Sequence, residues 1–249
     1  MAVFDKIQRR ALWTQKMMGH LNFFWFGPLM VLFLRFFFAY RCKNRRKVRR
    51  RIRELIAEYP KRPLLICANH LTMIDSLLLT WLLFDFRLLI NRYTYFPWNV
   101  PELANFGKNW LMRGLCYLGK CVYLERQGSI ASKRLVWEKI SYLNRFGETL
   151  CVFPEGGRSR TGNIDREAAM YGVGQLVQSN PRTLVLAVYL RGKAQKTYGI
   201  APQWGDRIWI DWKLVECKIA EGRKAQRDIT MQIFDQLENM ERKYHATWQ

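Results

Sequence analysis

Two short polar segments each follow an apolar run of strand length, and this arrangement constrains the fold more than any other feature. The first, Asn-His-Leu-Thr-Met-Ile-Asp, occupies residues 69–75 directly after the apolar residues 64–68. The second, Phe-Pro-Glu-Gly-Gly-Arg-Ser, occupies residues 153–159 after the run 149–152. In α/β sheets, binding loops gather at the carboxyl ends of the strands. The sequence therefore predicts that both polar segments belong to one site.

Apolar segments of strand length alternate with longer helical patterns along the chain. This alternation predicts one α/β domain, with a mostly parallel or mixed sheet flanked by helices. The apolar residues over 229–240 recur at helical spacing, which indicates a core-facing stripe. The predicted strands are residues 64–68, 87–90, 121–124, 149–153, 184–190 and 207–215. The predicted helices are residues 73–84, about 106–118, 129–146, about 166–178 and about 222–244.

The distribution of charge points to a membrane. The formal net charge is +21 and 14% of residues are aromatic, which implies an anionic partner. Residues 21–40 are almost wholly apolar and aromatic, and residues 41–53 carry Arg or Lys at nearly every position. This pairing is typical of a chain that sinks into a bilayer while its charges meet lipid phosphates. We therefore expect an anionic membrane surface as partner and no nucleic acid.

Residues 21–40 are close to the length of about 20 apolar residues that a membrane span requires. Pro28 interrupts this stretch, Arg35 lies inside it, and basic residues flank both ends. Positive charge on both flanks favours keeping both ends on the cytoplasmic side. We expect a monotopic anchor, with a single span as the alternative, on the inner or cytoplasmic membrane with the rest of the chain facing the cytosol. A cleaved signal peptide is disfavoured, because no small-residue cleavage site follows the apolar stretch.

The segment 69–75 has two interpretations from its residues alone. A histidine that leaves a buried strand, with Asp75 five positions on, can act as an oriented general base. Thr72 and Asp75 also fit a capping box, which satisfies the first amide groups of a helix and carries no chemistry. Cys67 lies near His70, but residues three apart in a strand point to opposite faces, which argues against a covalent Cys/His mechanism. The six cysteines show no zinc-type spacing, and we expect no metal.

The polar segments resemble the motifs of glycerolipid acyltransferases, the family typified by 1-acylglycerol-3-phosphate (lysophosphatidic acid) acyltransferase. The first signature of that family is Asn-His, four residues and then Asp, which matches Asn69, His70 and Asp75. The third signature is Phe-Pro-Glu-Gly-Thr-Arg-Ser, which matches residues 153–159 with Gly157 in place of the usual threonine.

Two further blocks of the family match more loosely. The second block, which ends in an arginine, resembles residues 119–126, and the last block resembles residues 184–189 with Ala187 where proline is usual. The resemblance covers roughly residues 62–191. It divides the chain into an N-terminal membrane-anchoring helical and polybasic segment, residues 1–58, and an acyltransferase catalytic domain, residues 59–249.

The resemblance implies a membrane-bound O-acyltransferase that moves a fatty acyl group from acyl-CoA or acyl carrier protein to the free hydroxyl of a lysophospholipid. Lysophosphatidic acid, giving phosphatidic acid, is the leading acceptor, and no cofactor is expected beyond the acyl donor. His70 would be the general base and Asp75 would fix its tautomer. The implied substrate-binding residues are Asn69, Arg126, Glu155, Gly156, Gly157, Arg158 and Ser159.

Several roles stay open at this level. The guanidinium groups of Arg126 and Arg158 suit a phosphate, although each would also be unremarkable as a surface arginine in so basic a chain. Glu155 is expected to order these arginines, with binding of an acceptor hydroxyl as the alternative. Ser159 would bind the headgroup or satisfy its own turn.

The acceptor is also open. Gly157, the altered second block and Ala187 leave room for a lyso-ornithine lipid, a lysophospholipid being remodelled or a specialised glycolipid. A non-catalytic basic protein that binds membranes or RNA is the alternative from another class. The aromatic segment 91–99 would either guide an acyl chain from the bilayer or form a packed loop.

Overall fold

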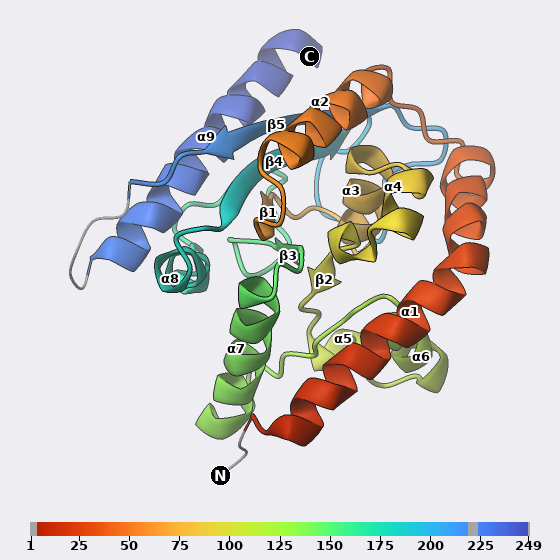
Figure 1. Ribbon diagram of the computed structural model, residues 1–249. Coiled ribbons are helices and arrows are strands. Elements are labelled where there is room, and N and C mark those ends of the chain that lie inside the picture. Colours follow the sequence, from red (N-terminus) through yellow and green to blue (C-terminus); the bar gives the residue numbers. More distant parts are fainter. Residues whose placement is uncertain (1–3, 219–223, 249) are drawn as a thin grey trace.

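The computed structural model describes residues 4–218 and 224–248 as a mixed five-stranded sheet with helices on both faces (Figure 1). The strand order is β2-β3-β1-β4-β5, with all neighbours parallel except the antiparallel pair β4 and β5. The strands are β1 (Leu64–Ala68), β2 (Trp98–Asn99), β3 (Leu150–Val152), β4 (Leu184–Gly192) and β5 (Ile208–Val215). The predicted α/β fold with a mostly parallel or mixed sheet is confirmed.

The helices connect these strands and flank the sheet. A π-helical turn, Phe33–Phe37, extends the first helix, and a short 3-10 turn, Tyr93–Tyr95, precedes β2. The α-helices are α1 (Lys6–Leu32), α2 (Arg45–Glu58), α3 (Asp75–Leu83), α4 (Phe86–Asn91), α5 (Leu103–Phe106), α6 (Trp110–Leu118), α7 (Ile130–Arg145), α8 (Gly172–Ser179) and α9 (Ala225–Trp248).

Alternate side chains of the strands enter two separate cores, as a sheet covered on both faces requires. In β1, Ile66 belongs to the core under α2, α3 and α4, whereas Leu65 belongs to the core under α7, α8 and α9. Figure 1 shows α9 running along one side of the sheet and α2 to α4 on the other. The stripe of α9 predicted to face the core is buried in the second of these cores, at Ile229, Ile233, Leu237 and Met240.

The sequence predictions were wrong in three segments. Residues 87–90 are helical rather than extended, because the Asp85 side chain accepts a hydrogen bond from Leu88 N and caps α4. Residues 121–124 form only isolated bridges, Asn99 with Cys121 and Glu102 with Leu124, instead of a strand. The helix predicted to begin near residue 166 begins at Gly172.

The aromatic segment 91–99 is a packed connection that ends in the edge strand β2. The side chains of Tyr93, Phe96 and Trp98 are 4%, 4% and 1% exposed, so they are not free to meet lipid. The rings of Tyr93 and Phe96 pack on Phe23 of α1 and on each other. Of the two interpretations, the packed loop is the one that the structure supports.

Helix α1 packs against α4 and α6 and continues through Pro28 into the π-helical turn. Figure 1 shows its ribbon changing direction and turning upward in its second half. Residues 6–37 are long and apolar enough to cross a membrane, and only 28% of their apolar window is buried. The large apolar residues that α1 and its extension expose are Ile7, Met17, Met18, Leu21, Phe24, Trp25, Leu29, Leu32, Phe33, Phe36 and Phe37.

Polar side chains on the inner face of α1 dock it onto the rest of the chain. Gln15 Nε2 donates to the carbonyl oxygens of Tyr117 and Cys121, both at 3.0 Å. Lys16 Nζ lies 2.5 Å from Glu148 Oε1. Because α1 also contributes Phe23 to the core of the sheet, the division at residue 58 into two domains stays a prediction.

Candidate active site

The two polar segments lie side by side at the carboxyl ends of the neighbouring parallel strands β1 and β3. Cys67 is in register with Val152, so the two segments leave the sheet next to each other, at the carboxyl ends of β1 and β3. Ser159 N donates to the His70 carbonyl oxygen at 2.8 Å, and the rings of His70 and Phe153 stack at 3.9 Å with 13° between their planes. The segments predicted to form one site are therefore in direct contact.

His70 and Asp75 form the centre of this site. His70 Nδ1 lies 3.0 Å from Asp75 Oδ2, and the side chains are 19% and 5% exposed. With a proton on Nδ1 donated to the carboxylate, the other ring nitrogen, Nε2, has a free lone pair. The residues that the structure describes offer Nε2 no hydrogen-bond partner. This is the geometry that a general base requires.

Asp75 also binds the loop that precedes α3, but the predicted capping box is not formed, because the first amide groups of α3 have no side-chain hydrogen bond. Asp75 Oδ2 accepts from Leu71 N at 2.6 Å and from Thr72 N at 2.7 Å, and Thr72 Oγ1 donates to Asp75 Oδ1. These bonds fix the loop that carries His70. The carboxylate orients the imidazole and the backbone around it at once.

Asn69 bonds to the neighbouring strand. Its Oδ1 accepts from Leu190 N at 2.7 Å and its Nδ2 donates to Leu190 O at 3.0 Å. The side chain is 3% exposed, and both amide atoms are thus engaged with β4. This arrangement favours a positioning role for Asn69, whereas its predicted contact with substrate stays a prediction.

Glu155 binds backbone rather than arginine in the described residues. Its Oε1 accepts from His70 N at 3.2 Å and its Oε2 accepts from Asp165 N at 3.3 Å. The interpretation that Glu155 orders Arg126 and Arg158 therefore needs correction: the carboxylate orders the loop of His70. Burial raises the pKa of Glu155 to about 7, although the two N–H donors oppose the rise.

The raised pKa of Glu155 predicts a pH-dependent stability. Between the unfolded pKa near 4.5 and the folded pKa near 7, the folded state binds more protons, so stability falls as pH rises. At about 1.4 kcal/mol per pKa unit, the fall is on the order of 3 kcal/mol. Glu155→Gln keeps one acceptor oxygen but does not titrate. We expect its unfolding free energy relative to wild type, measured with denaturant, to be higher at pH 8 than at pH 5. An equal gap between the two proteins at both pH values would contradict this cause.

Arg126 and Arg158 both reach the loops around His70. Arg126 Nε lies 2.6 Å from Glu102 Oε2, and its Nη2 donates to the Gly156 carbonyl oxygen. Arg158 Nη1 donates to the Gly199 carbonyl oxygen at 3.1 Å, and its guanidinium lies over the Tyr198 ring. Both cations lie beside these loops, each held by a partner that no sequence pattern indicated, and their contact with substrate stays a prediction.

The loop after β4 is a part of the site that the sequence did not reveal. Gly199 N donates to Leu71 O at 2.9 Å, and Met73 N donates to Ile200 O at 3.1 Å. This loop therefore pairs directly with the segment between His70 and Asp75. Its residues follow no periodic pattern, so only the tertiary fold identifies them.

Ser159 satisfies its own turn. The hydroxyl donates to Asn163 O and lies 3.3 Å from Thr161 Oγ1, and the residue is 6% exposed. Of its two interpretations, the structure favours the turn hydroxyl, and headgroup binding by Ser159 stays a prediction.

The two glycines of the second segment have different requirements. Gly156 has φ +66°, and a Cβ built on it would lie 2.6 Å from Met170 Cγ. Gly157 has ordinary backbone angles, and its Cβ would lie 3.9 Å from Arg126 Nη1. We expect Gly156→Ala to cost about 1–3 kcal/mol of unfolding free energy. Gly157→Thr, which restores the usual family residue, serves as the tolerated control. Equal effects in thermal unfolding would contradict this reading.

The covalent alternative at Cys67 gains no support. Its thiol lies in the core under α7 to α9, and complete burial raises its pKa far above the usual range. A buried neutral thiol is a poor nucleophile. In residues 4–218 and 224–248, no three His, Cys, Asp or Glu side chains form a group that could hold a metal ion.

The comparison with protein families agrees with the motif assignment. The model of the family described as Acyltransferase matches residues 39–190. A search of curated proteins finds no match. Among solved structures, the chain is similar to the crystal structure of the 1-acyl-sn-glycerophosphate (LPA) acyltransferase PlsC from Thermotoga maritima. The two share 18% sequence identity over 94% of this chain and 98% of that chain, with a TM-score of 0.40.

Proposed function

The chain belongs to the acyltransferase family, and from this premise we propose that it transfers a fatty acyl group from a thioester to the hydroxyl of a lysophospholipid. The acyl donor is acyl-CoA or acyl carrier protein, and the leading acceptor is lysophosphatidic acid. The observation that carries the proposal is the His70–Asp75 pair, 3.0 Å apart, with Nε2 unengaged by any described residue. A thioester is already activated, so the main task is to make a lipid hydroxyl nucleophilic.

In the proposed mechanism, His70 Nε2 takes the proton from the acceptor hydroxyl as its oxygen attacks the thioester carbonyl. Asp75 holds the ring and stabilises the imidazolium that forms. The C–S bond then breaks, and the departing thiolate takes the proton back from His70. An ester and a free thiol result, so the histidine returns to its starting state. The Gly157 N–H has no hydrogen-bond acceptor among the described residues and is our candidate donor to the oxyanion.

Arg126 and Arg158 are the proposed ligands of the acceptor phosphate. Guanidinium groups make paired, charge-assisted bonds with phosphate oxygens. Each already has a protein partner, Glu102 for one and the Gly199 carbonyl for the other, which would hold its side chain in place for the ligand.

The proposed location is the surface of an anionic membrane. The exposed apolar residues of α1 continue onto α6, where Trp110, Leu111 and Met112 are 82%, 50% and 41% exposed. Helices that expose apolar surface on one side and basic residues beside it lie in the membrane interface. We propose that α1 and α6 enter the cytoplasmic leaflet, with the catalytic loops on the cytosolic side.

A comparison of acceptors tests the substrate. We expect kcat/KM for lysophosphatidic acid to exceed that for monoacylglycerol of the same chain by about 100-fold, since two charge-assisted interactions depend on the phosphate. Arg126→Gln and Arg158→Gln should each reduce this preference, with Arg134→Gln, on an exposed face of α7, as the charge-matched control. Preference for an acceptor without phosphate, such as a lyso-ornithine lipid or a glycolipid, would assign the same chemistry to that acceptor instead.

A further inference from the structure

Helix α2 has two distinct faces. Val48, Ile52 and Leu55 pack into the core beneath α2, which holds the helix firmly against the sheet. Five basic residues on another side of the helix face the start of α4. Between the two helices is a pocket of about 740 Å³. The lining residues of this pocket are Arg46, Lys47, Arg49, Arg50, Arg53, Asp85, Phe86 and Arg87.

The pocket carries a large excess of positive charge. Six of its lining residues are Arg or Lys and one is an acid. That acid, Asp85, is engaged: one oxygen accepts from Leu88 N at 2.8 Å and the other pairs with Arg53 at 3.1 Å. Arg46 and Arg50, like Arg49 and Arg53, are four residues apart on one helix, where like charges repel. A bound anion would relieve this repulsion.

Arg49 is the most buried of these cations and has an unsatisfied donor. Its Nη2 donates to the Trp81 carbonyl oxygen, whereas its Nε is buried with no acceptor among the described residues. Burial lowers the pKa of Arg49 to about 10, so it stays charged at neutral pH. A buried N–H of a charged group is costly to leave unpaired, and an anion beside this guanidinium would offset the cost.

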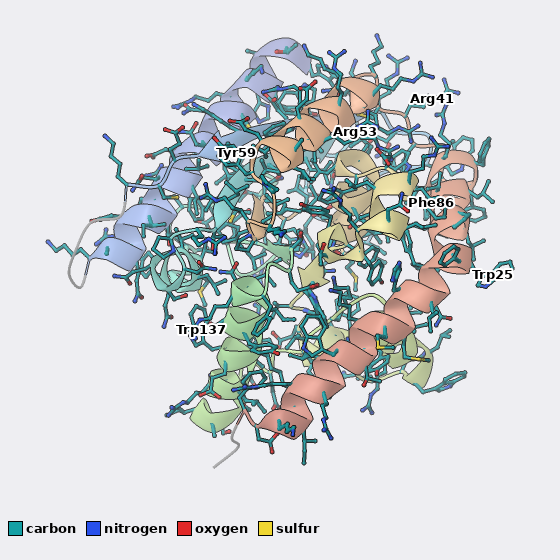
Figure 2. The ribbon with its side chains drawn as sticks, viewed as in Figure 1. Trp25, Arg41, Arg53, Tyr59, Phe86 and Trp137 are labelled. Carbon is teal, nitrogen blue, oxygen red and sulfur yellow. The ribbon has the colours of Figure 1, made fainter. Side chains whose placement is uncertain are left out.

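One wall residue of the pocket contacts the apolar helix α1, and none of the lining residues belongs to the catalytic loops. The ring of Phe86, at the pocket wall, packs on Phe23 of α1 with 5.5 Å between centroids. Figure 2 shows Arg53 and Phe86 on neighbouring helices and Trp25 projecting from the outer side of α1. Asp75, beside His70, is the first residue of α3, and Asp85, at the pocket, follows the end of this helix. The nine residues of α3, about 14 Å in length, therefore separate the two carboxylates.

We propose that this pocket is a second phosphate site, which binds the headgroup of an anionic phospholipid whose acyl chains lie along the exposed face of α1. Paired guanidinium groups match phosphate oxygens, and the adjoining apolar helix matches the chains. The bound lipid is an anchor, and its phosphate does not reach His70. The site rests on the membrane association proposed above, but it does not depend on acyl transfer.

Vesicle partitioning tests the site without any acyl donor. The full-length protein is mixed with phosphatidylcholine vesicles that contain phosphatidic acid, and bound and free protein are separated by flotation. We expect Arg49→Gln to weaken partitioning by about tenfold or more, since it loses both a charge and a charge-assisted bond. The matched control is Arg51→Gln on the same helix, where the side chain lies over Trp212 outside the pocket. The control should lose no more than about fivefold, the effect of one surface charge.

Further arms keep the test decisive. If Arg49→Gln does not fold, the double variant Arg46→Gln/Arg50→Gln replaces it, because both of these side chains are exposed. Its control is the double variant Arg51→Gln/Lys213→Gln, which removes the same charge outside the pocket. Equal losses in pocket and control variants would overturn the site. A loss of free coenzyme A binding with vesicle binding unchanged would overturn the lipid assignment in favour of a soluble phosphate ligand. Wild type that binds neither neutral nor anionic vesicles would refute the membrane association itself.

Discussion

His70→Ala is expected to lower kcat for acyl transfer by about 1,000-fold, within the range that a positioned general base contributes. The variant removes the ring that Asp75 orients, and with it the Nε2 lone pair that takes the proton of the acceptor hydroxyl in the proposed mechanism. The measurement is release of free thiol from long-chain acyl-CoA with added lysophosphatidic acid, using detergent-purified protein.

Controls separate chemistry from folding in this experiment. The His70 ring stacks on Phe153, so thermal unfolding of the variant must be compared with wild type. Phe153→Leu removes the stacked ring while keeping the histidine, and it should retain most of its activity. Full activity in His70→Ala would mean that the contact between His70 and Asp75 only orders its loop and that the proposed mechanism is wrong.

Lys120→Met is expected to have the largest effect on stability, a loss of about 3–5 kcal/mol, because it leaves the buried carboxylate of Glu148 without its fully buried cation. Lys120 is fully buried, and its Nζ donates to Glu148 Oε2 at 2.8 Å and to the carbonyl oxygens of Phe96 at 2.7 Å and Tyr93 at 3.2 Å. Methionine fills the space but satisfies none of these acceptors. Denaturant unfolding in detergent measures the loss.

Lys16→Met is the matched control for the buried pair. Lys16 Nζ also pairs with Glu148, at 2.5 Å from Oε1, but its side chain is 18% exposed, so water screens this pair more than the fully buried pair with Lys120. We expect this control to lose less than half as much as Lys120→Met. Because Lys16 lies on α1, its variant should also weaken the docking of that helix. Similar losses of unfolding free energy in both variants would contradict the claim that Lys120 stabilises the buried carboxylate more than Lys16 does.

The sequence predicted the inner strands well because their patterns are strong. Continuous apolar runs are typical of buried parallel strands. Each such run overlaps a strand of the sheet: residues 64–68 overlap β1, residues 149–153 overlap β3 and residues 184–190 overlap β4. The prediction of a strand over residues 87–90 was wrong because a short apolar run does not distinguish a strand from a helix. The Asp85 cap makes this segment helical.

The site was predictable where it depends on strand ends and not where it depends on loops. Parallel neighbours bring His70 next to residues 153–159, as the motif positions indicated. The partners of Glu155 and Arg126 come from tertiary contacts with Asp165 and Glu102, which carry no periodic signal. The docking of α1 through Gln15 and Lys16 was hidden for the same reason, since isolated polar residues on a helix resemble a solvated face.

The most direct test of the proposed acyl transfer is whether thiol release by the wild-type protein depends on the acceptor. Purified protein is incubated with a long-chain acyl-CoA or acyl carrier protein thioester, with and without lysophosphatidic acid, and thiol and phosphatidic acid are measured together. The proposed acyl transfer predicts equal amounts of thiol and phosphatidic acid, both appearing only when the acceptor is present. Thiol release that proceeds equally without acceptor and yields free fatty acid would contradict it, because the site would then be a thioesterase.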